Sequence, residues 1–186
     1  MGKEAGSFFI MALVGLACAY VYICSLGGFK TSFQTPVTQA SGRSVVGGPS
    51  LSAQKIDSIL SSAGSPAAGD GNVFTLDSAQ YNIDDAVALA FFHRESSYGT
   101  AGVATQTHSL GNIRCSDGYS CIAGFRSYAS WQDGITDWFR LISGPGYVGS
   151  GLVTPEQITA RYAPSSDGNN PSAYAASVEQ DVSTWR

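Results

Sequence analysis

The chain has little positive charge. Its 186 residues include 10 lysine and arginine residues against 14 aspartate and glutamate residues, which gives a formal net charge of -4. Proteins that bind nucleic acid usually present a basic surface to the phosphate groups. The charge balance therefore argues against a nucleic-acid partner, although it does not by itself favour another class of ligand.

Residues that bind metals are also few. The sequence contains two histidines, His93 and His108, and four cysteines, two of which lie in an apolar segment near the N-terminus. The other two, Cys115 and Cys121, have five residues between them. Together with the two histidines they make a poor set of structural zinc ligands. We expect no metal and no cofactor, and we interpret this cysteine pair as a disulfide or as free thiols.

An apolar run without any charge extends from Phe8 to Leu26. A helix of about 20 apolar residues is long enough to cross a bilayer, so residues 1–27 are predicted to form an N-terminal transmembrane anchor. The alternative is a cleaved signal peptide. Its apolar region would normally be shorter and would end in a small-x-small cleavage site, which the sequence from Cys24 to Gly28 matches poorly.

The composition changes after the apolar run. Residues 28–50 are rich in glycine, serine, threonine, glutamine and valine and keep no helical or strand period. Such a segment is typical of a flexible linker. The remaining residues, 51–186, are numerous enough to form one domain with its own core, and no internal repeat is apparent in them.

The pattern after residue 50 predicts a series of helices with one hairpin, which is a mainly helical α+β class. Helix start signals occur at Ser52, Asp84-Asp85, Ser130, Thr154-Pro155 and Pro171. A loop is expected at Gly69 to Asn72. The aromatic residues that follow Ser130 recur at helical spacing, and we interpret them as core residues instead of sugar-binding platforms.

The hairpin is predicted from two short segments. Residues Asn112 to Cys115 and Cys121 to Arg126 can pair across a turn that contains Asp117-Gly118, a sequence suited to positive φ angles. This pairing would bring Cys115 and Cys121 close enough for a disulfide in an oxidising compartment.

One carboxylate lies at the end of a strongly apolar helix. Steps of three and four residues back from Glu95 reach Phe92, Phe91, Ala88 and Val87. Desolvation on this stripe and the negative end of the helix dipole both raise the pKa of a carboxyl group. A carboxyl that stays protonated near neutral pH can serve as a general acid. The alternative is a solvated or salt-bridged glutamate, which is common in the last turn of a helix.

The residues around this carboxylate resemble a known family. The helix ends in Glu95-Ser96-Ser97-Tyr98-Gly99, and Gly111-Asn112-Ile113 follows. This order is similar to the glucosaminidase branch of the lysozyme-like superfamily, the mannosyl-glycoprotein endo-beta-N-acetylglucosaminidase-like domains, in which Glu-Ser-x-x-Gly precedes a Gly-Asn-Ile or Phe-Gly-Ile loop. The resemblance extends from about Leu51 to Trp185 and includes Arg161-Tyr162-Ala163-Pro164.

The resemblance implies a lysozyme-like fold and a set of site residues. Glu95 would be the catalytic acid, Tyr162 would lie close to it, and Asp117 would be a second acid across the cleft. A turn equally requires Asp-Gly, so Asp117 also has a purely structural interpretation. The sugar site would include Tyr98, Gly99, His108 and Asn112.

These expectations describe a peptidoglycan hydrolase that cleaves β-1,4 bonds of the glycan strand on the N-acetylglucosamine side. Its partners would be the glycan strands and, through residues 8–26, the membrane, with the catalytic domain extracytoplasmic. A muramidase and a lytic transglycosylase are alternatives within the enzyme class. A cell-wall-binding or scaffold protein without turnover is the alternative outside it.

Overall fold

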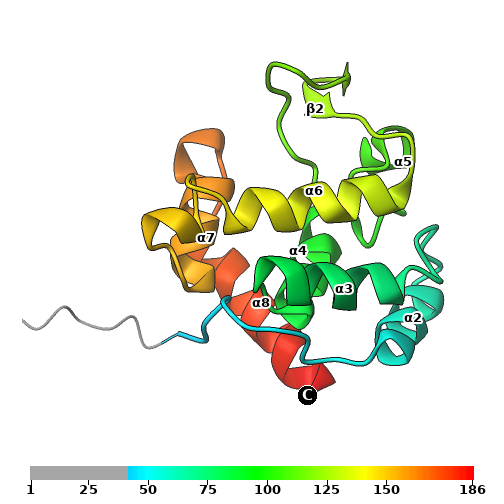
Figure 1. Ribbon diagram of the computed structural model, residues 1–186. Helices are drawn as coiled ribbons and strands as arrows, with labels where there is room; N and C mark the ends of the chain where they lie inside the picture. The colour runs from blue at the N-terminus through cyan, green and yellow to red at the C-terminus, as the bar shows by residue number, and fades with distance from the viewer. Residues whose placement is uncertain (1–41) are drawn as a thin grey trace, which may run out of the picture. The chain divides into compact units, whose positions relative to one another are not determined.

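The computed structural model describes residues 42–186 (Figure 1). The predicted anchor, residues 1–27, and the first part of the expected linker lie outside this range. Between residues 42 and 186, no helix is both long enough and apolar enough to cross a membrane.

The described residues are mainly helical, with one two-stranded sheet, which confirms the mainly helical α+β class. The elements in chain order are α2 (Ala53–Ser62), α3 (Gly71–Tyr81), α4 (Asp85–Ser96), α5 (Ala104–Thr107), β1 (Cys121–Ile122), β2 (Phe125–Arg126), α6 (Trp131–Ser143), the 3-10 turn η1 (Val148–Ser150), α7 (Pro155–Tyr162), the 3-10 turn η2 (Ser165–Asp167) and α8 (Pro171–Trp185).

Five of the helices begin where the sequence predicts. In each case a side-chain oxygen of the residue before the helix accepts a backbone N–H of the first turn, which satisfies a donor that has no partner within the helix. The capping residues are Ser52 for α2, Asp84 for α4, Ser130 for α6, Thr154 for α7 and Asn170 for α8. At α7 the two residues form a capping box, because the Gln157 side chain also accepts the backbone N–H of Thr154.

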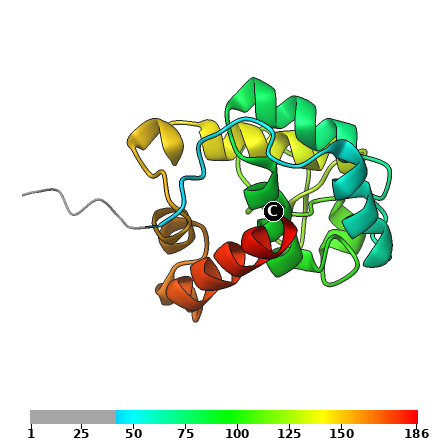
Figure 2. The same cartoon turned by 90° about the horizontal axis from the view of Figure 1, so that it is seen from below.

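Helix α4 forms the centre of the fold. All of its residues from Asp85 to Phe92 are buried, and α8 runs beside it (Figure 2). An aromatic cluster packs around it, with the ring centres of Phe91 and Phe92 each 5.2 Å from that of Trp138. Trp138 and Phe139 of α6 are fully buried, so the interpretation of these aromatic residues as core is confirmed.

Helix α3 was not predicted, and its first residue explains why. The expected loop over Gly69 to Asn72 ends early, because α3 begins at Gly71. A Cβ atom at Gly71 would lie 2.2 Å from the Ala53 carbonyl oxygen at the start of α2. Glycine is therefore required at this position by close packing between two helices.

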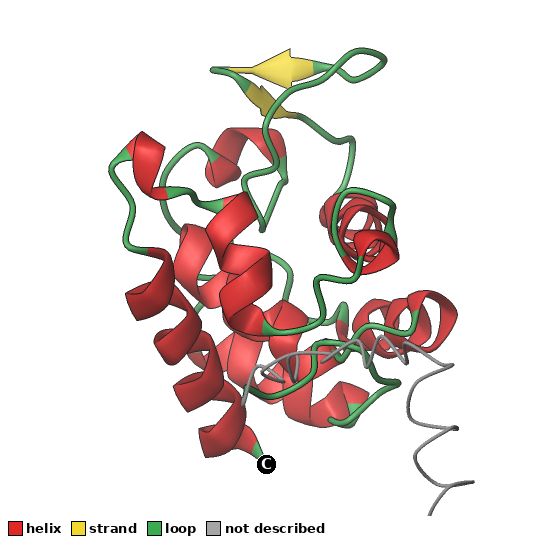
Figure 3. Ribbon diagram, turned by 90° about the vertical axis from the view of Figure 1, so that its left-hand side faces the viewer, coloured by secondary structure: helices red, strands yellow, loops and turns green. Residues whose placement is uncertain are grey.

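The hairpin differs from the predicted pairing. β1 and β2 pair antiparallel, with Ile122 opposite Phe125, and the turn between them consists of Ala123 and Gly124 at φ angles of 50° and 85°. The other predicted strand is reduced to a single bridge between Arg114 and Phe125. Asp117-Gly118 lies in the wider loop that precedes β1. Figure 3 shows this hairpin standing beyond the helical body.

The folded part begins before residue 51, which corrects the predicted boundary. Val45 is 1% exposed and its backbone N–H donates to the Val153 carbonyl. Val46 forms a bridge with Ile83 just before α4. Residues 43–51, which we call the strap, therefore pack on the domain instead of forming the end of a flexible linker (cyan in Figure 2).

Candidate active site

Glu95 lies in a hollow of about 410 Å³ at the C-terminal end of α4. The walls come from the loop after α5, from β2, from the end of α7 and from the start of α8. The residues around it are Arg94, Glu95, Asn112, Arg114, Phe125, Tyr162, Ala163, Asn169, Asn170, Ala173 and Tyr174. The site is thus assembled from five segments that are distant in the sequence.

The environment of Glu95 makes its carboxyl group a weak acid. Burial among the aromatic side chains raises its pKa, and hydrogen bonding from Tyr174, the neighbouring Asn112 amide and the charge of Arg94 lower it by less, so the pKa reaches about 7. An acid with this pKa is partly protonated at neutral pH and can donate a proton to a bound ligand. The apolar stripe of α4 predicts this increase in the pKa of Glu95.

Tyr174 makes the closest side-chain contact with Glu95. Its hydroxyl donates to Glu95 Oε1 at 2.7 Å, and its ring packs against Phe91 with 5.2 Å between ring centres. Burial and the adjacent carboxyl group both raise the pKa of Tyr174. The hydroxyl therefore stays protonated and keeps donating, which fixes one oxygen of Glu95 and leaves Oε2 for other partners.

Asn112 connects the loop after α5 to the end of α4. Its backbone is left-handed, with φ of 46°, and its side-chain Nδ2 donates to the Glu95 carbonyl oxygen at 2.7 Å. The Oδ1 atom is buried and has no partner within residues 42–186. Asn112 therefore lines the hollow beside Glu95 and holds the end of α4, while its role in sugar binding stays a prediction.

Tyr162, the last residue of α7, also lines the hollow. Its hydroxyl donates to the Gly111 carbonyl oxygen, and its ring packs edge-on against Phe91. Burial and the proximity of Glu95 raise the pKa of this hydroxyl well above its ordinary value. A Cβ at Gly111 would lie 2.4 Å from Trp138 Cδ1 and 2.9 Å from the Tyr162 hydroxyl, so glycine allows this loop to approach Tyr162.

A second hollow of about 440 Å³ continues from the first toward the hairpin. The two share Asn112, Arg114 and Tyr162, and we call them together the groove. An ion pair between Arg114 Nη2 and Asp167 Oδ2, 2.7 Å apart, lies where they meet. Glu95 lines the first hollow, and the second extends the groove from there along the hairpin lobe.

Four of the predicted site residues do not line this groove. Asp117 is exposed in the loop before β1 and makes no hydrogen bond with residues 42–186. Tyr98 is buried and stacks on His93, with ring centres 4.8 Å apart. His108 binds the Tyr128 carbonyl through Nδ1 at 2.9 Å. Gly99 is a packing position, where a Cβ would approach Leu110 and Trp131 within 3 Å.

The hairpin lobe, residues 113–128, is held on α6 by one buried carboxylate. Asp137 is 3% exposed and accepts hydrogen bonds from Arg126, Arg140, Tyr119 and Tyr128. Burial alone would raise its pKa, but the bonds from Tyr128, Arg126 and Arg140 outweigh burial and lower it. The lobe that carries Arg114 is thus fixed through Asp137.

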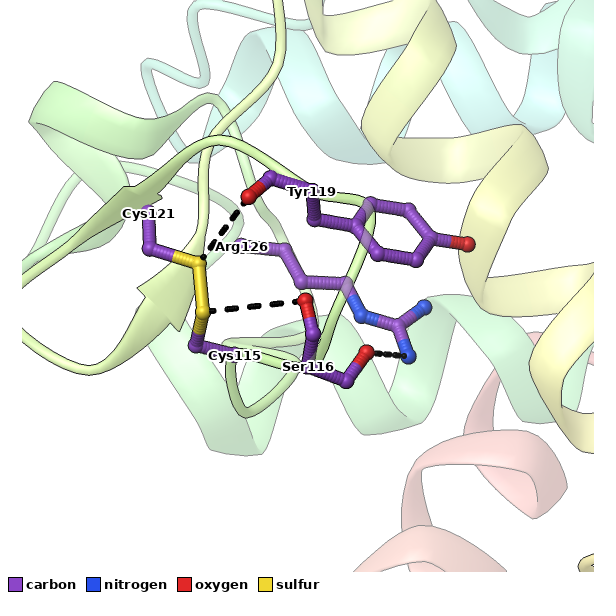
Figure 4. The surroundings of a disulfide bond; sticks show 5 residues. All are labelled: Cys115, Ser116, Tyr119, Cys121 and Arg126. Atoms are coloured by element: carbon purple, nitrogen blue, oxygen red, sulfur yellow. Dashed lines mark hydrogen bonds between the residues drawn. A yellow bond between two sulfur atoms is a disulfide. The ribbon is translucent and has the colours of Figure 1, made fainter.

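A disulfide closes the same lobe. Cys115 and Cys121 are bonded, with 5.8 Å between their Cα atoms, which confirms the expected pairing. Figure 4 shows the disulfide beside Tyr119 and Arg126, whose guanidinium lies 3.8 Å from the centre of the Tyr119 ring. Among residues 42–186, no group of three or more histidine, cysteine or acidic side chains is placed to hold a metal ion.

The main residue that the sequence analysis missed is Tyr174. It lies three residues after Pro171, within the last predicted helix, where its spacing with Val178 and Val182 indicates only a buried side of that helix. Asparagine 170 and the arginines of the groove were also missed. Only the packing of α8 beside α4 brings these residues to Glu95, and no local signal in the sequence reports that packing.

No model of a known protein family matches the chain, and no curated protein is significantly similar to it. The function of this site must therefore be argued from its own residues.

Proposed function

We propose that the protein is a glycoside hydrolase of lysozyme-like fold that cleaves β-1,4 bonds in peptidoglycan glycan strands, with Glu95 as the general acid. The single observation that carries this proposal is the Glu95 carboxyl group, which is held by Tyr174 in an open groove and whose pKa is raised by burial. Glycosidic oxygens are poor leaving groups unless they are protonated, and an acid with a raised pKa is the group that does so near neutral pH.

The neighbours of Glu95 support this role. Tyr174 binds Oε1, so the transferable proton resides on Oε2. Asn112 donates to the Glu95 carbonyl oxygen and so holds the end of α4 against the loop after α5. Tyr162 binds the Gly111 carbonyl of the same loop. In this proposal Glu95 protonates the bridging oxygen, and Asn112 and Tyr162 hold the wall from which it acts.

A second candidate function is a lytic transglycosylase, which uses one glutamate and yields an anhydro product. Within the part of the chain that the structure describes, Glu95 is the only carboxylate that lines the first hollow. An inverting hydrolase needs a second carboxyl about 6.5 to 9.5 Å away to activate water. Asp117 is exposed outside the groove, which favours a mechanism with one acid.

The products distinguish these possibilities. We expect the full chain, incubated with purified peptidoglycan, to release glycan fragments that mass spectrometry identifies by their ends. Fragments with N-acetylglucosamine at the reducing end would support a glucosaminidase. Fragments with muramic acid at the reducing end would support a muramidase, and anhydro products would support a transglycosylase. Peptidoglycan that stays intact under conditions in which the protein is folded would contradict all three and leave a binding role.

We also propose that the protein is anchored in a membrane through residues 8–26, with the domain extracytoplasmic. The support is the uncharged apolar run, which lies outside the described residues, together with a disulfide that requires an oxidising compartment. The full chain should remain in the membrane fraction after a carbonate wash. An amino terminus mapped beyond residue 26 would show cleavage instead.

A further inference from the structure

The groove is rich in arginine although the protein is acidic. The whole chain has 10 lysine and arginine residues, and Lys3 and Lys30 precede residue 42, so eight lie in the described part. Four of these eight line the two hollows: Arg94, Arg114, Arg126 and Arg161. The carboxylates that line the groove are Glu95 and Asp167. Positive charge is therefore concentrated where the ligand must lie.

Two of the four arginines are already committed to the fold. Arg126 binds Asp137 at 2.8 Å and the Ser116 hydroxyl at 2.8 Å, and it is nearly buried. Arg161 donates to the Gly146 carbonyl oxygen. These side chains hold the walls of the second hollow and are poorly placed to change partners.

The other two arginines remain accessible to a ligand. Arg94, which precedes Glu95, makes no hydrogen bond or ion pair with any side chain between residues 42 and 186. The Arg114 side chain is 73% exposed, and its only partner within the described residues 42–186 is Asp167, which is 35% exposed. Exposed ion pairs of this kind are weak in water and exchange partners readily.

We propose that Arg114, assisted by Arg94, binds a carboxylate carried by the substrate, and that Asp167 occupies the Arg114 guanidinium until that carboxylate arrives. This inference rests on the proposed function and narrows its substrate class. Peptidoglycan strands bear peptide stems with free carboxylates, whereas neutral N-acetylated glycans such as chitin bear none. A guanidinium can hold a carboxylate with two parallel hydrogen bonds, and Asp167 engages only Nη2.

The position of the pair suits this role. Arg114 belongs to both hollows and is bridged to Phe125 of β2, so its backbone is fixed by the hairpin lobe while its side chain is free to turn. Asp167 ends the 3-10 turn η2 between α7 and α8. Exchange of Asp167 for a substrate carboxylate would keep the Arg114 guanidinium paired, and Arg94 supplies a second positive charge at the first hollow for the added carboxylate.

The test measures binding to soluble peptidoglycan fragments, before and after their carboxyl groups are amidated. The full chain carries Glu95→Gln, so that fragments are bound without being cleaved. We expect amidation to weaken binding about tenfold, and added salt to weaken only the binding of unmodified fragments. Arg114→Gln should weaken the binding of unmodified fragments about tenfold, as amidation does. The same substitution should change the binding of amidated fragments by less than about twofold.

Two further variants separate a ligand-binding role from a structural one. Asp167→Asn should tighten binding of unmodified fragments, because it releases Arg114, whereas a structural ion pair would be damaged equally by either substitution. Lys55→Gln removes the same charge from α2, away from the groove, and is the matched control. Equal effects of Arg114→Gln and Lys55→Gln, weaker binding by Asp167→Asn, or no effect of amidation would overturn the inference.

The outcome also separates this inference from the proposed function. Charge-dependent binding by a protein that cleaves no glycan would support the role of Arg114 and contradict the hydrolase. Cleavage of unmodified and amidated strands at equal rates would support the hydrolase and contradict the role of Arg114. If no fragment binds to any variant, both are wrong.

Discussion

At the scale of single residues, the hydroxyl of Tyr174 and the carboxyl of Glu95 form the pair on which the chemistry depends. The hydroxyl donates to the carboxyl, which favours the ionised form of Glu95 and opposes the effect of burial. The pKa of about 7 is therefore a balance between desolvation by the aromatic core and hydrogen bonding from α8.

Tyr174→Phe should shift this balance without leaving a cavity. Loss of the hydrogen bond raises the pKa of Glu95, so the fall of kcat/KM at alkaline pH should move to higher pH. Tyr162→Phe is the matched control, because its hydroxyl binds the Gly111 carbonyl and not Glu95. It should lower turnover without moving the alkaline limb. Identical pH profiles for wild type and Tyr174→Phe would show that Tyr174 does not tune Glu95.

Glu95 should also lower the stability of the folded protein at alkaline pH. Its pKa is raised from 4.5 to about 7 on folding, so the folded state loses stability as the pH rises between these two values. The upper limit is about 3 kcal/mol, and partial exposure of the side chain reduces it. We expect Glu95→Gln to match wild type at about pH 4 and to raise the free energy of unfolding by about 1 to 3 kcal/mol at about pH 8. Urea denaturation at both pH values measures the difference in free energy of unfolding between the variant and wild type. The same difference at both pH values would contradict the predicted role of Glu95.

At the scale of elements, the hairpin lobe depends on Asp137 more than on its disulfide. The disulfide joins residues only six apart, so its loss should cost at most about 2 to 3 kcal/mol. Asp137→Asn leaves the nearly buried Arg126 without its charged partner, which typically costs about 3 to 5 kcal/mol. Because the pKa of Asp137 is lowered on folding, its contribution is present above the ordinary carboxyl pKa and is lost as the pH falls through the lowered one.

Urea denaturation of Asp137→Asn and of the Cys115→Ser, Cys121→Ser double variant compares these two contributions directly. We expect the first variant to be the less stable at neutral pH and to be less sensitive than wild type to acid. A larger loss from the double variant would show that the disulfide, and not the Asp137 network, fixes the lobe.

The elements also show how far sequence reasoning extends. Five helix starts could be predicted because caps such as Ser52 and Thr154 act on the backbone within three residues. Helix α3 could not be predicted, because Gly71 is required by its contact with α2. The turn at Ala123-Gly124 could not be predicted either, because Ala-Gly is a weaker hairpin signal than the Asp-Gly that precedes it. Glu95, Asn112 and Tyr162 were found by local pattern and resemblance. Tyr174 was missed because its partner lies 79 residues away.

At the scale of the whole molecule, the strap connects the start of the described chain to the central helix. Ser50 and Leu51 donate backbone N–H groups to Asp85 Oδ1, and Asp85 is fully buried at the start of α4. Burial raises the pKa of Asp85, and the bonds from Ser50 and Leu51 lower it by less. Without the strap this carboxyl would lose these hydrogen bonds, and the core would lose the buried side chain of Val45.

A protein that begins at residue 51 should therefore be less stable than one that begins at residue 42. Val45→Ala in the full chain should cost about 1 to 3 kcal/mol, the range for removing buried methyl groups. Gly48→Ala is the control, since a Cβ there meets nothing within 4 Å. Thermal unfolding compares the four proteins. Equal melting temperatures for the two starting points would show that the strap does not belong to the folded unit.

The most direct test of the central claim is the turnover of Glu95→Gln on purified peptidoglycan. The amide preserves the shape of the side chain and can still accept the bond from Tyr174, but it cannot donate a proton to a leaving group. We predict a loss on the order of a hundredfold or more, the range for a positioned general acid, in a protein that unfolds cooperatively and binds fragments as wild type does. Activity close to wild type in the folded variant would contradict the assignment of Glu95.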